Sequence, residues 1–252
     1  MARRWSPVIE ATEKFTVLRD PERPSGRLLR QGGMDASYVD LADPAHLEFD
    51  YLRWLRAVVE AAGARHVVHV GGAACALARA LAAARPGDLQ EVVEVDPDVL
   101  EIARRHLGLR RGPGLKVRTG DGRAVLAARA DGSVDAVVVD AFVGARVPRP
   151  LVTAEALADV ARVAALVAVN VVDAKPLAEA AAIAAGLEAA FPHVLAVGPS
   201  AVVARRRGGN VVLVGAHAPL PVQRLRARLA ADPAPAVVAA FAAGDAVPFT
   251  DG

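Results

Sequence analysis

The feature that most constrains this chain is a regular alternation of short apolar strands and helical segments from residue 66 onward. Alanine-rich or amphipathic segments predict the helices, and apolar runs predict strands at 66–70, 91–95, 115–118, 136–139 and 164–172. Repeated strand–helix units favour a doubly wound, mostly parallel sheet with helices on both faces. The uninterrupted run 136–139 suits the centre of such a sheet, where both faces are covered. The sequence therefore predicts an α/β fold.

The N-terminal part of the chain follows a different pattern. Residues 9–17 alternate polar and apolar side chains, with Glu13 as the misfit, and predict one strand; 27–30 and 37–41 predict two more. Asp43-Pro44 then has the form of a helix start. We expect a small β segment over residues 1–42 and a main domain over 43–252. So small a β unit must pack on the main domain or on a second subunit, because it is not stable alone.

The C-terminal part predicts an antiparallel hairpin. Residues 194–204 and 210–216 are apolar enough to form two strands, and the arginines at 205–207 with Gly208-Gly209 between them are typical of an exposed turn. Strand–helix units followed by such a hairpin indicate a Rossmann-like sheet with an antiparallel end.

Composition and charge argue against several classes of partner. The net charge is only +2, aromatic residues make up 4% of the chain, and the arginines are scattered, so we expect no nucleic-acid partner. The most apolar region, residues 156–191, is interrupted by charged residues before it reaches membrane-spanning length, so we expect no membrane partner. The N-terminus lacks the apolar core of a signal peptide. The predicted location is cytoplasmic.

Cysteine and histidine chemistry is equally limited. Cys75 is the only cysteine, which excludes an intrachain disulfide and a multi-cysteine metal site. Small neighbours favour a packed core thiol at Cys75 over a nucleophile. His66 and His69 lie on one predicted strand with no third ligand nearby, so we expect structural or pocket-lining roles and no metal.

Four predicted strands end in glycine or acidic residues: Gly71-Gly72 after the first, Glu94 at the second, Asp121-Gly122 after the third and Asp140 at the fourth. Ligands of open α/β sheets bind beyond the carboxyl ends of the strands. Small residues let a ligand approach the backbone, and an acid at the second strand end can accept hydrogen bonds from ribose hydroxyls. Each acid alone could be a helix cap. Their joint placement predicts a nucleoside site.

The glycine loop discriminates between nucleosides. It reads Gly71-Gly72-Ala73-Ala74-Cys75-Ala76, so the later glycines of the dinucleotide fingerprint are missing, and the lysine of a P-loop is absent. An NAD-binding oxidoreductase is therefore disfavoured. A sulfonium nucleoside, which has no pyrophosphate, fits better.

These motifs resemble those of the spermidine synthases, the polyamine aminopropyltransferases. The similarity covers most of residues 27–145 and touches 248–251 near the end. The segments that carry it are His69-Val70-Gly71-Gly72, Val93-Glu94-Val95-Asp96-Pro97, Gly120-Asp121-Gly122, Asp135 to Asp140, Ser37-Tyr38, Asp43-Pro44 and Phe49-Asp50-Tyr51.

The resemblance implies a class I S-adenosylmethionine-dependent methyltransferase fold, an N-terminal β unit and a homodimer. It also implies roles for individual residues. Asp140 would be the catalytic residue beside the reacting centre, Tyr51 would lie near the acceptor, Glu94 would hold the ribose and Asp121 with Gly122 would contact adenine. The expected donor-binding set is Gly71, Gly72, Glu94, Val95, Asp121, Gly122 and Asp140.

The departures from the family pattern concern the polyamine side of the site. The loop aspartate is Ala74, the second aspartate of the Asp-x-x-Asp-Pro motif is Val143, and a glutamine before the Ser-Tyr pair is Ala36. An amine nucleophile needs a carboxylate to orient it and take its proton, and burying an unpaired ammonium is costly. Asp35, Asp96 and Asp173 are candidate replacements.

Two functions stay open at this point. The first is a transferase that uses S-adenosylmethionine or its decarboxylated form, with no metal, and passes a methyl or aminopropyl group to an unidentified small-molecule acceptor. An amine is one candidate, but ordinary putrescine is not expected. The second is a catalytically inactive nucleoside-binding or scaffold homologue.

Overall fold

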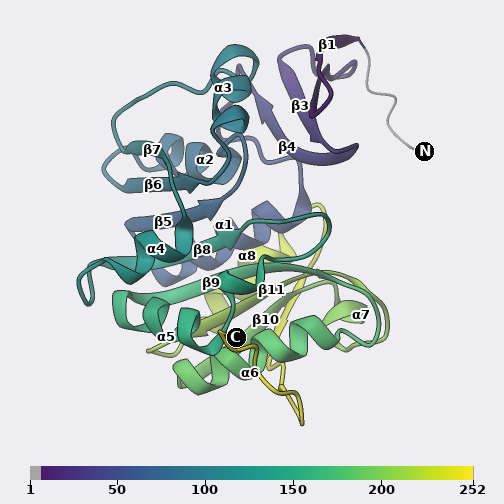
Figure 1. Cartoon of the computed structure of the whole chain (residues 1–252). Coiled ribbons are helices and arrows are strands. Elements are labelled where there is room, and N and C mark those ends of the chain that lie inside the picture. Colours follow the sequence, from purple (N-terminus) through teal and green to yellow (C-terminus); the bar gives the residue numbers. More distant parts are fainter. Residues whose placement is uncertain (1–6, 252) are drawn as a thin grey trace.

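The structure, a computed structural model, describes residues 7–251; residues 1–6, on which the prediction about a leader segment partly rests, and residue 252 lie outside this range. Two sheets form the framework (Figure 1). The small antiparallel sheet has the order β1-β2-β3-β4 and is made of Val8–Ala11, Phe15–Arg19, Gly26–Gln31 and Met34–Asp40. No helix within 7–251 is long and apolar enough to span a membrane.

The main sheet has the strand order β12-β10-β11-β9-β8-β5-β6-β7. Strands β5 to β9 pair in parallel, with β7 at the edge of the sheet, whereas β11 runs antiparallel to both of its neighbours. This arrangement confirms the predicted mostly parallel sheet with an antiparallel end. The strands are β5 His66–Gly71, β6 Leu89–Glu94, β7 Leu115–Thr119, β8 Val134–Asp140, β9 Ala164–Asp173, β10 His193–Gly198, β11 Gly209–Ala216 and β12 Val237–Ala239.

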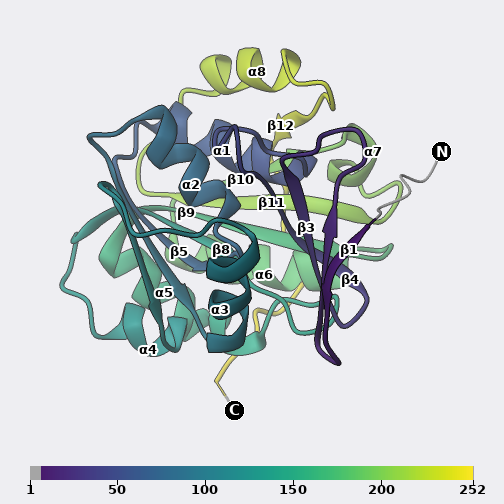
Figure 2. The same cartoon turned by 90° about the horizontal axis from the view of Figure 1, so that it is seen from above.

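Helices cover both faces of this sheet, because parallel strands need crossover connections. In Figure 2, α1 and α8 lie on one side of the strands and α5 and α6 on the other. The helices are α1 Asp50–Ala62, α2 Ala76–Ala84, α3 Pro97–His106, α4 Gly122–Ala127, α5 Ala154–Val163, α6 Ala178–Ala190, α7 Ser200–Val203 and α8 Val222–Ala230, with a 3₁₀ turn at Arg149–Leu151.

The alternation of side chains along the strands divides the core into two layers. In β8, Ala136 and Val138 join the apolar cluster under α1, α2 and α3, while Val137 and Val139 join the cluster under α5 and α6. All four are almost fully buried. Both faces of β8 must therefore be apolar, which explains why its sequence reads as an unbroken run rather than an alternation.

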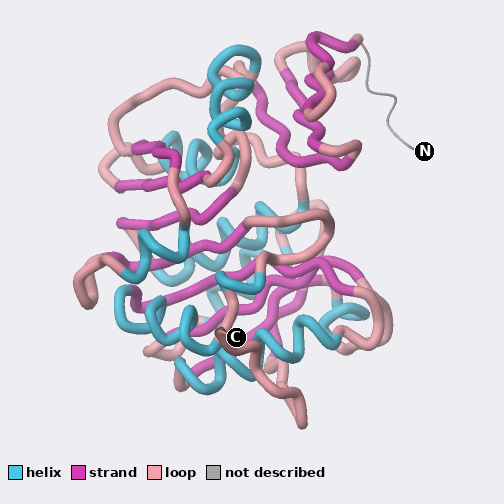
Figure 3. The backbone as a smooth tube through the Cα atoms, viewed as in Figure 1, coloured by secondary structure: helices cyan, strands magenta, loops and turns pink. Residues whose placement is uncertain are grey.

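The small sheet packs on the main domain and forms a separate group of strands in Figure 3. Its residues Phe15, Val17, Leu29 and Val39 belong to the same apolar cluster as α1 and α2. Lys14 pairs with Asp96 of the loop before α3 at 2.6 Å. The small sheet was predicted to pack on the main domain or on a second subunit. In the structure it packs on the main domain of the same chain.

The predicted single strand over 9–17 is wrong, because the chain turns within it. The amide of Thr12 donates to the carbonyl of Phe15 at 2.7 Å, and the amide of Phe15 donates to Thr12 Oγ1 at 2.9 Å. Glu13, the misfit in the pattern, lies inside this turn. The alternation of polar and apolar residues continues through the turn between β1 and β2, so the sequence pattern predicted a single strand.

The helix predicted to start at Asp43-Pro44, with Pro44 as its first residue, begins six residues later, at Asp50. The Asp43 carboxylate accepts the amide of Ala45 at 3.1 Å, and its carbonyl accepts that of His46, which makes a local turn instead of a helix cap. Gly63 ends α1 in the left-handed conformation, with φ of 71°.

The C-terminal hairpin is only partly as predicted. Strand β10 stops at Gly198, the short helix α7 follows Pro199, and β11 then pairs with β10 in the expected antiparallel sense. Proline at 199 lacks the amide that a continuing ladder needs, so the strand ends there.

Candidate functional site

The parallel register gathers the predicted site residues at one edge of the main sheet. Gly71 pairs with Asp140 across β5 and β8, and Val70 pairs with Val93, directly before Glu94 of β6. Asp121 follows β7 by two residues. Because all four strands run in the same direction, their carboxyl ends meet at this edge.

The loop after β5 has an unusual backbone. Gly71 and Gly72 have φ of 80° and 94°, and Ala73 and Cys75 also have positive φ although they carry side chains. A Cβ on Gly71 would lie 2.6 Å from the carbonyl oxygen of Asp140, so only glycine fits there. The amide of Gly72 donates to that same carbonyl at 2.9 Å. Strained residues of this kind cluster at ligand sites, because the surrounding structure must hold them in place.

Glu94 is buried, with an exposed fraction of 7%, at the end of β6. Burial raises the pKa of its carboxyl group, while hydrogen bonds from the backbone amides of Asp96, Ala73 and Val95 oppose the shift. The bond from the Asp96 amide measures 3.1 Å. Glu94 is thus tied to the glycine loop, whereas the next side chain, Val95, is 69% exposed.

Asp121 and Gly122 form the start of α4. The Asp121 carboxylate accepts the amide of Ala124 at 3.0 Å, so it caps this helix, which is the structural role that sequence reasoning left open. A Cβ on Gly122 would lie 2.3 Å from Cγ1 of Val70. Close packing of α4 on β5 therefore requires glycine at this position.

Asp140 is at the centre of a hydrogen-bonded network. Its Oδ1 accepts the side-chain amide of Asn170 at 2.9 Å, Asn170 Oδ1 accepts that of Asn210 at 3.2 Å, and the Tyr51 hydroxyl also bonds to the carboxylate. Burial raises the pKa of Asp140 to about 6, against the two hydrogen bonds, with a smaller contribution from the charge of Glu94. Such a carboxyl group can take up a proton near neutral pH.

Sequence reasoning missed Asn170 and Asn210. The only signal was Asn170 itself, a single amide within the apolar strand β9 that is 1% exposed. A buried amide needs a partner, so an isolated asparagine in a central strand indicates a polar network. Nothing in the sequence identified Asp140 or Asn210 as that partner.

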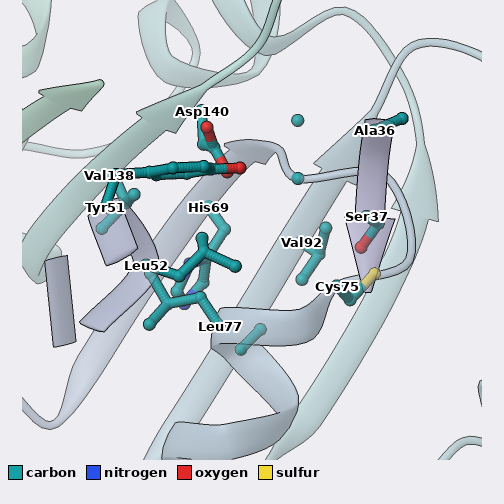
Figure 4. A pocket seen from close by; sticks show the side chains of 13 residues that line it. Ala36, Ser37, Tyr51, Leu52, His69, Cys75, Leu77, Val92, Val138 and Asp140 are labelled. Carbon is teal, nitrogen blue, oxygen red and sulfur yellow. The ribbon is translucent and has the colours of Figure 1, made fainter. Parts of the chain in front are cut away.

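A small cavity lies beneath this network (Figure 4). Its volume is ≈10 Å³, about the room of one water molecule. Asp140 and Tyr51 point toward each other at one end, His69 lies below them, and Ser37 of the small sheet borders the other end. Burial lowers the pKa of His69 to about 4, so its ring is neutral at physiological pH, and Nε2 lies 2.9 Å from the side-chain oxygen of Gln90.

Cys75 and His66 take structural positions. Cys75 is buried, and burial raises the pKa of its thiol to about 12, which does not suit a nucleophile. His66 pairs with Glu91 at 2.5 Å. Within residues 7–251, no group of three His, Cys, Asp or Glu side chains could hold a metal ion.

The three candidate replacements for the missing acids are occupied elsewhere. Asp35 pairs with Arg30 at 2.6 Å, Asp96 pairs with Lys14 and caps α3, and Asp173 accepts the amide of Ala180 at 3.0 Å. Among the described residues, none of the three borders the cavity.

Ala74, Val143 and Ala36 stand where the resemblance to spermidine synthases implies two acids and a glutamine, and the structure places these three apolar residues differently. Ala74 is completely buried in the loop, and Val143 is 75% exposed after β8. Ala36 borders the cavity. Asp140 is thus the one carboxylate of residues 7–251 in the cavity wall.

Comparison with known proteins agrees with this architecture. No protein-family model and no curated protein matches the sequence. Among solved structures, a probable spermidine synthase from Corynebacterium glutamicum ATCC 13032 superposes with a TM-score of 0.88 at 26% identity, over 98% of this chain and 96% of that one. The chain has a spermidine synthase-like fold.

More distant structures share this fold. A spermidine synthase in complex with the transition state analogue AdoDATO superposes on the spermidine synthase-like chain with a TM-score of 0.65 at 15% identity, over 88% of this chain and 78% of that one. The human methyltransferase-like protein 13 in complex with SAH superposes with a TM-score of 0.56 at 22% identity, over 70% and 86%. The predicted class I methyltransferase fold is therefore confirmed.

Proposed function

We propose that the protein is a transferase that binds S-adenosylmethionine or its decarboxylated form and passes a methyl or aminopropyl group to a small acceptor. The observation that carries this proposal is the placement of two carboxylates at the ends of β6 and β8, the strands on either side of β5 and its glycine loop. Glu94 is held by backbone amides beside the glycine loop, and Asp140 is held by Tyr51 and Asn170. Structures with this fold occur in complex with AdoDATO and with SAH, which supports a donor of this kind.

The donor site follows from the strand ends. Glu94 would accept hydrogen bonds from the ribose hydroxyls. Its carboxylate already accepts hydrogen bonds from backbone amides, but its oxygens have further lone pairs for these hydroxyls. The exposed Val95 would cover one face of adenine, with Asp121 and Gly122 at its edge. Gly71 and Gly72 would let the sulfonium end of the donor approach the backbone.

The chemical step needs few groups. The acceptor nitrogen uses its lone pair to form a bond to the carbon attached to the sulfonium, and the carbon–sulfur bond breaks. The sulfur keeps that electron pair and becomes a neutral thioether, while the proton released from the nitrogen passes to the Asp140 carboxylate. Tyr51 and Asn170 fix the position of this carboxylate. Holding donor and acceptor in line supplies most of the rate.

A second function, nucleoside binding without turnover, is favoured by one observation. The family acids that flank the acceptor are replaced by the buried Ala74 and the exposed Val143. A transferase releases the thioether product when acceptor is added, whereas a binding protein does not. Product release with any acceptor therefore separates the two functions.

The test of donor binding is a thermal shift with S-adenosylmethionine, decarboxylated S-adenosylmethionine, methylthioadenosine and NAD. A ligand at one hundred times its dissociation constant stabilises the fold by roughly 2.7 kcal/mol. We expect stabilisation by the sulfonium nucleosides, and its loss in Glu94→Ala. Glu101→Ala, which changes an exposed acid on α3, should keep the full ligand-induced shift. The proposal is wrong if S-adenosylmethionine, decarboxylated S-adenosylmethionine and methylthioadenosine all leave the melting temperature unchanged.

A further inference from the structure

The small sheet is attached to the loop after β6, directly beside Glu94. Lys14, in the turn between β1 and β2, has its Nζ 2.6 Å from Oδ2 of Asp96. The side-chain amide of Gln31, the last residue of β3, donates to the same oxygen at 3.4 Å. Two side chains of the small sheet therefore converge on one carboxylate oxygen of the main domain.

Asp96 connects this contact to Glu94. Its amide donates to Oε1 of Glu94 at 3.1 Å, and its Oδ1 accepts the amide of Asp98 at 3.0 Å and so caps α3. The three polar groups of Asp96 thus have three different partners: the Glu94 carboxylate, the start of α3 and the small sheet. Because Asp96 is fixed at both its side chain and its amide, the position of the Glu94 carboxylate depends on what holds Asp96.

The other ionic contacts between the small sheet and α3 lie at the opposite end of this helix. Glu10 of β1 pairs with Arg105 at 3.3 Å and with His106, both in the last turn of α3. These contacts hold the small sheet on the main domain without touching the loop that carries Glu94. The contact of Lys14 and Gln31 with Asp96 therefore has a consequence for the site that the contacts of Glu10 do not have.

We propose that Lys14 and Gln31 are positioning residues for the donor. Through Asp96 they hold the Glu94 carboxylate where the ribose hydroxyls can reach it. This inference rests on the proposed transferase function and adds a part for the small sheet in donor binding. A carboxylate that accepts hydrogen bonds from a ligand must be held by its surroundings, because a small displacement lengthens these bonds and weakens them.

The test compares methylthioadenosine with its 2′,3′-dideoxy analogue, which lacks both ribose hydroxyls, by calorimetry. In Lys14→Met we expect methylthioadenosine to bind about fivefold more weakly, a difference of about 1 kcal/mol. The affinity for the dideoxy analogue should stay unchanged, because this ligand makes no hydrogen bond to Glu94. Lys14→Arg keeps the cation and should retain the affinity to within about twofold. Gln31→Leu should weaken binding by about twofold, again for methylthioadenosine alone.

Two control variants separate this role from general effects of charge. Lys14 Nζ also donates to Asp98 at 3.1 Å, so Asp98→Asn weakens the second contact of Lys14 and leaves Asp96 in place. Lys116→Met removes an exposed lysine of β7. Both variants should bind methylthioadenosine as the wild type does.

Unchanged affinity for methylthioadenosine in Lys14→Met would overturn the inference. An equal loss for the dideoxy analogue would also overturn it, since Lys14 would then support the site in general and not the ribose contact. A loss in Asp98→Asn as large as that in Lys14→Met has the same meaning. If the wild-type protein binds neither methylthioadenosine nor a sulfonium nucleoside, the proposed function is wrong and this inference with it. If the wild type binds them and only the variants behave otherwise than expected, only the role of the small sheet is wrong.

Discussion

At the residue scale, Asp140 is a carboxylate whose burial lowers the stability of the fold when the group is charged. Its carboxyl group lies where burial disfavours the charge, and only the Tyr51 hydroxyl and the Asn170 amide compensate. The chain keeps three polar side chains, Tyr51, Asp140 and Asn170, at the end of an otherwise apolar core. Functional sites commonly break local rules in this way, and the rest of the fold supplies the stability.

This environment predicts that Asp140→Asn raises the free energy of unfolding at about pH 8. The folded pKa of about 6 lies above the ordinary value of 3.8, so the folded state binds more protons between these values. The wild-type fold therefore loses stability as pH rises through this window, and an asparagine does not. Urea unfolding at about pH 8 and at pH 3 measures the effect, which should be present at the first and absent at the second.

The matched control is Asp245→Asn, which changes an exposed carboxylate in the C-terminal loop and should have little effect at either pH. A decrease in stability for Asp140→Asn at about pH 8 would contradict the assigned environment. The same variant should also lose turnover, because the amide takes no proton from the acceptor.

At the scale of the element, the loop from β5 to α2 shapes the proposed donor site. Gly71 and Gly72 both have positive φ, but they differ in their surroundings. A Cβ on Gly71 would meet the carbonyl of Asp140 at 2.6 Å and Cβ of Ala141 at 2.8 Å, whereas a Cβ on Gly72 meets nothing within 4 Å. A side chain at Gly72 would therefore cost backbone strain alone, whereas a side chain at Gly71 would cost both backbone strain and steric overlap.

We predict that Gly72→Ala costs about 1–3 kcal/mol, the range for a residue held in a sparsely populated backbone region. Gly71→Ala should cost clearly more, because β5 and β8 must also separate where Gly71 pairs with Asp140. Chemical denaturation of both variants measures the difference. Equal losses would show that the overlap at Gly71 relaxes without cost.

At the scale of the whole molecule, the small sheet is continuous with the core of the main domain. Phe15 and Leu29 are packed into the cluster below α1 and α2, and Glu10 pairs with Arg105 of α3 at 3.3 Å. The chain itself therefore supplies the support that a four-stranded unit needs. The small sheet no longer requires a second subunit for its stability.

The homodimer implied by the family resemblance stays a prediction. Light scattering should give twice the 26.1 kDa of the chain if it forms. The exposed side chains of Val8, Met34 and Leu41 on and beside the small sheet are the first positions to change in a test, since apolar surface drives most association. A mass of one chain at micromolar concentration would contradict the dimer.

Local patterns predicted most of the architecture. The order of strands and helices from His66 to Ala190 followed from apolar runs, amphipathic or alanine-rich segments and glycines. The errors lie where a pattern ran through a turn, as at Glu13, or where a local cap motif made only a turn, as at Asp43. In both cases a few backbone hydrogen bonds outweighed the pattern.

By itself the sequence determined which residues stand at strand ends, since period and turn chemistry act over a few positions along the chain. Only the tertiary structure decided which of them meet. Asn210, Asn170 and Asp140 come from β11, β9 and β8, and the register of three strands brings them into one line. The same packing turned Asp35, Asp96 and Asp173 to other partners, because hydrogen bonding and burial are settled by neighbours in space rather than in sequence.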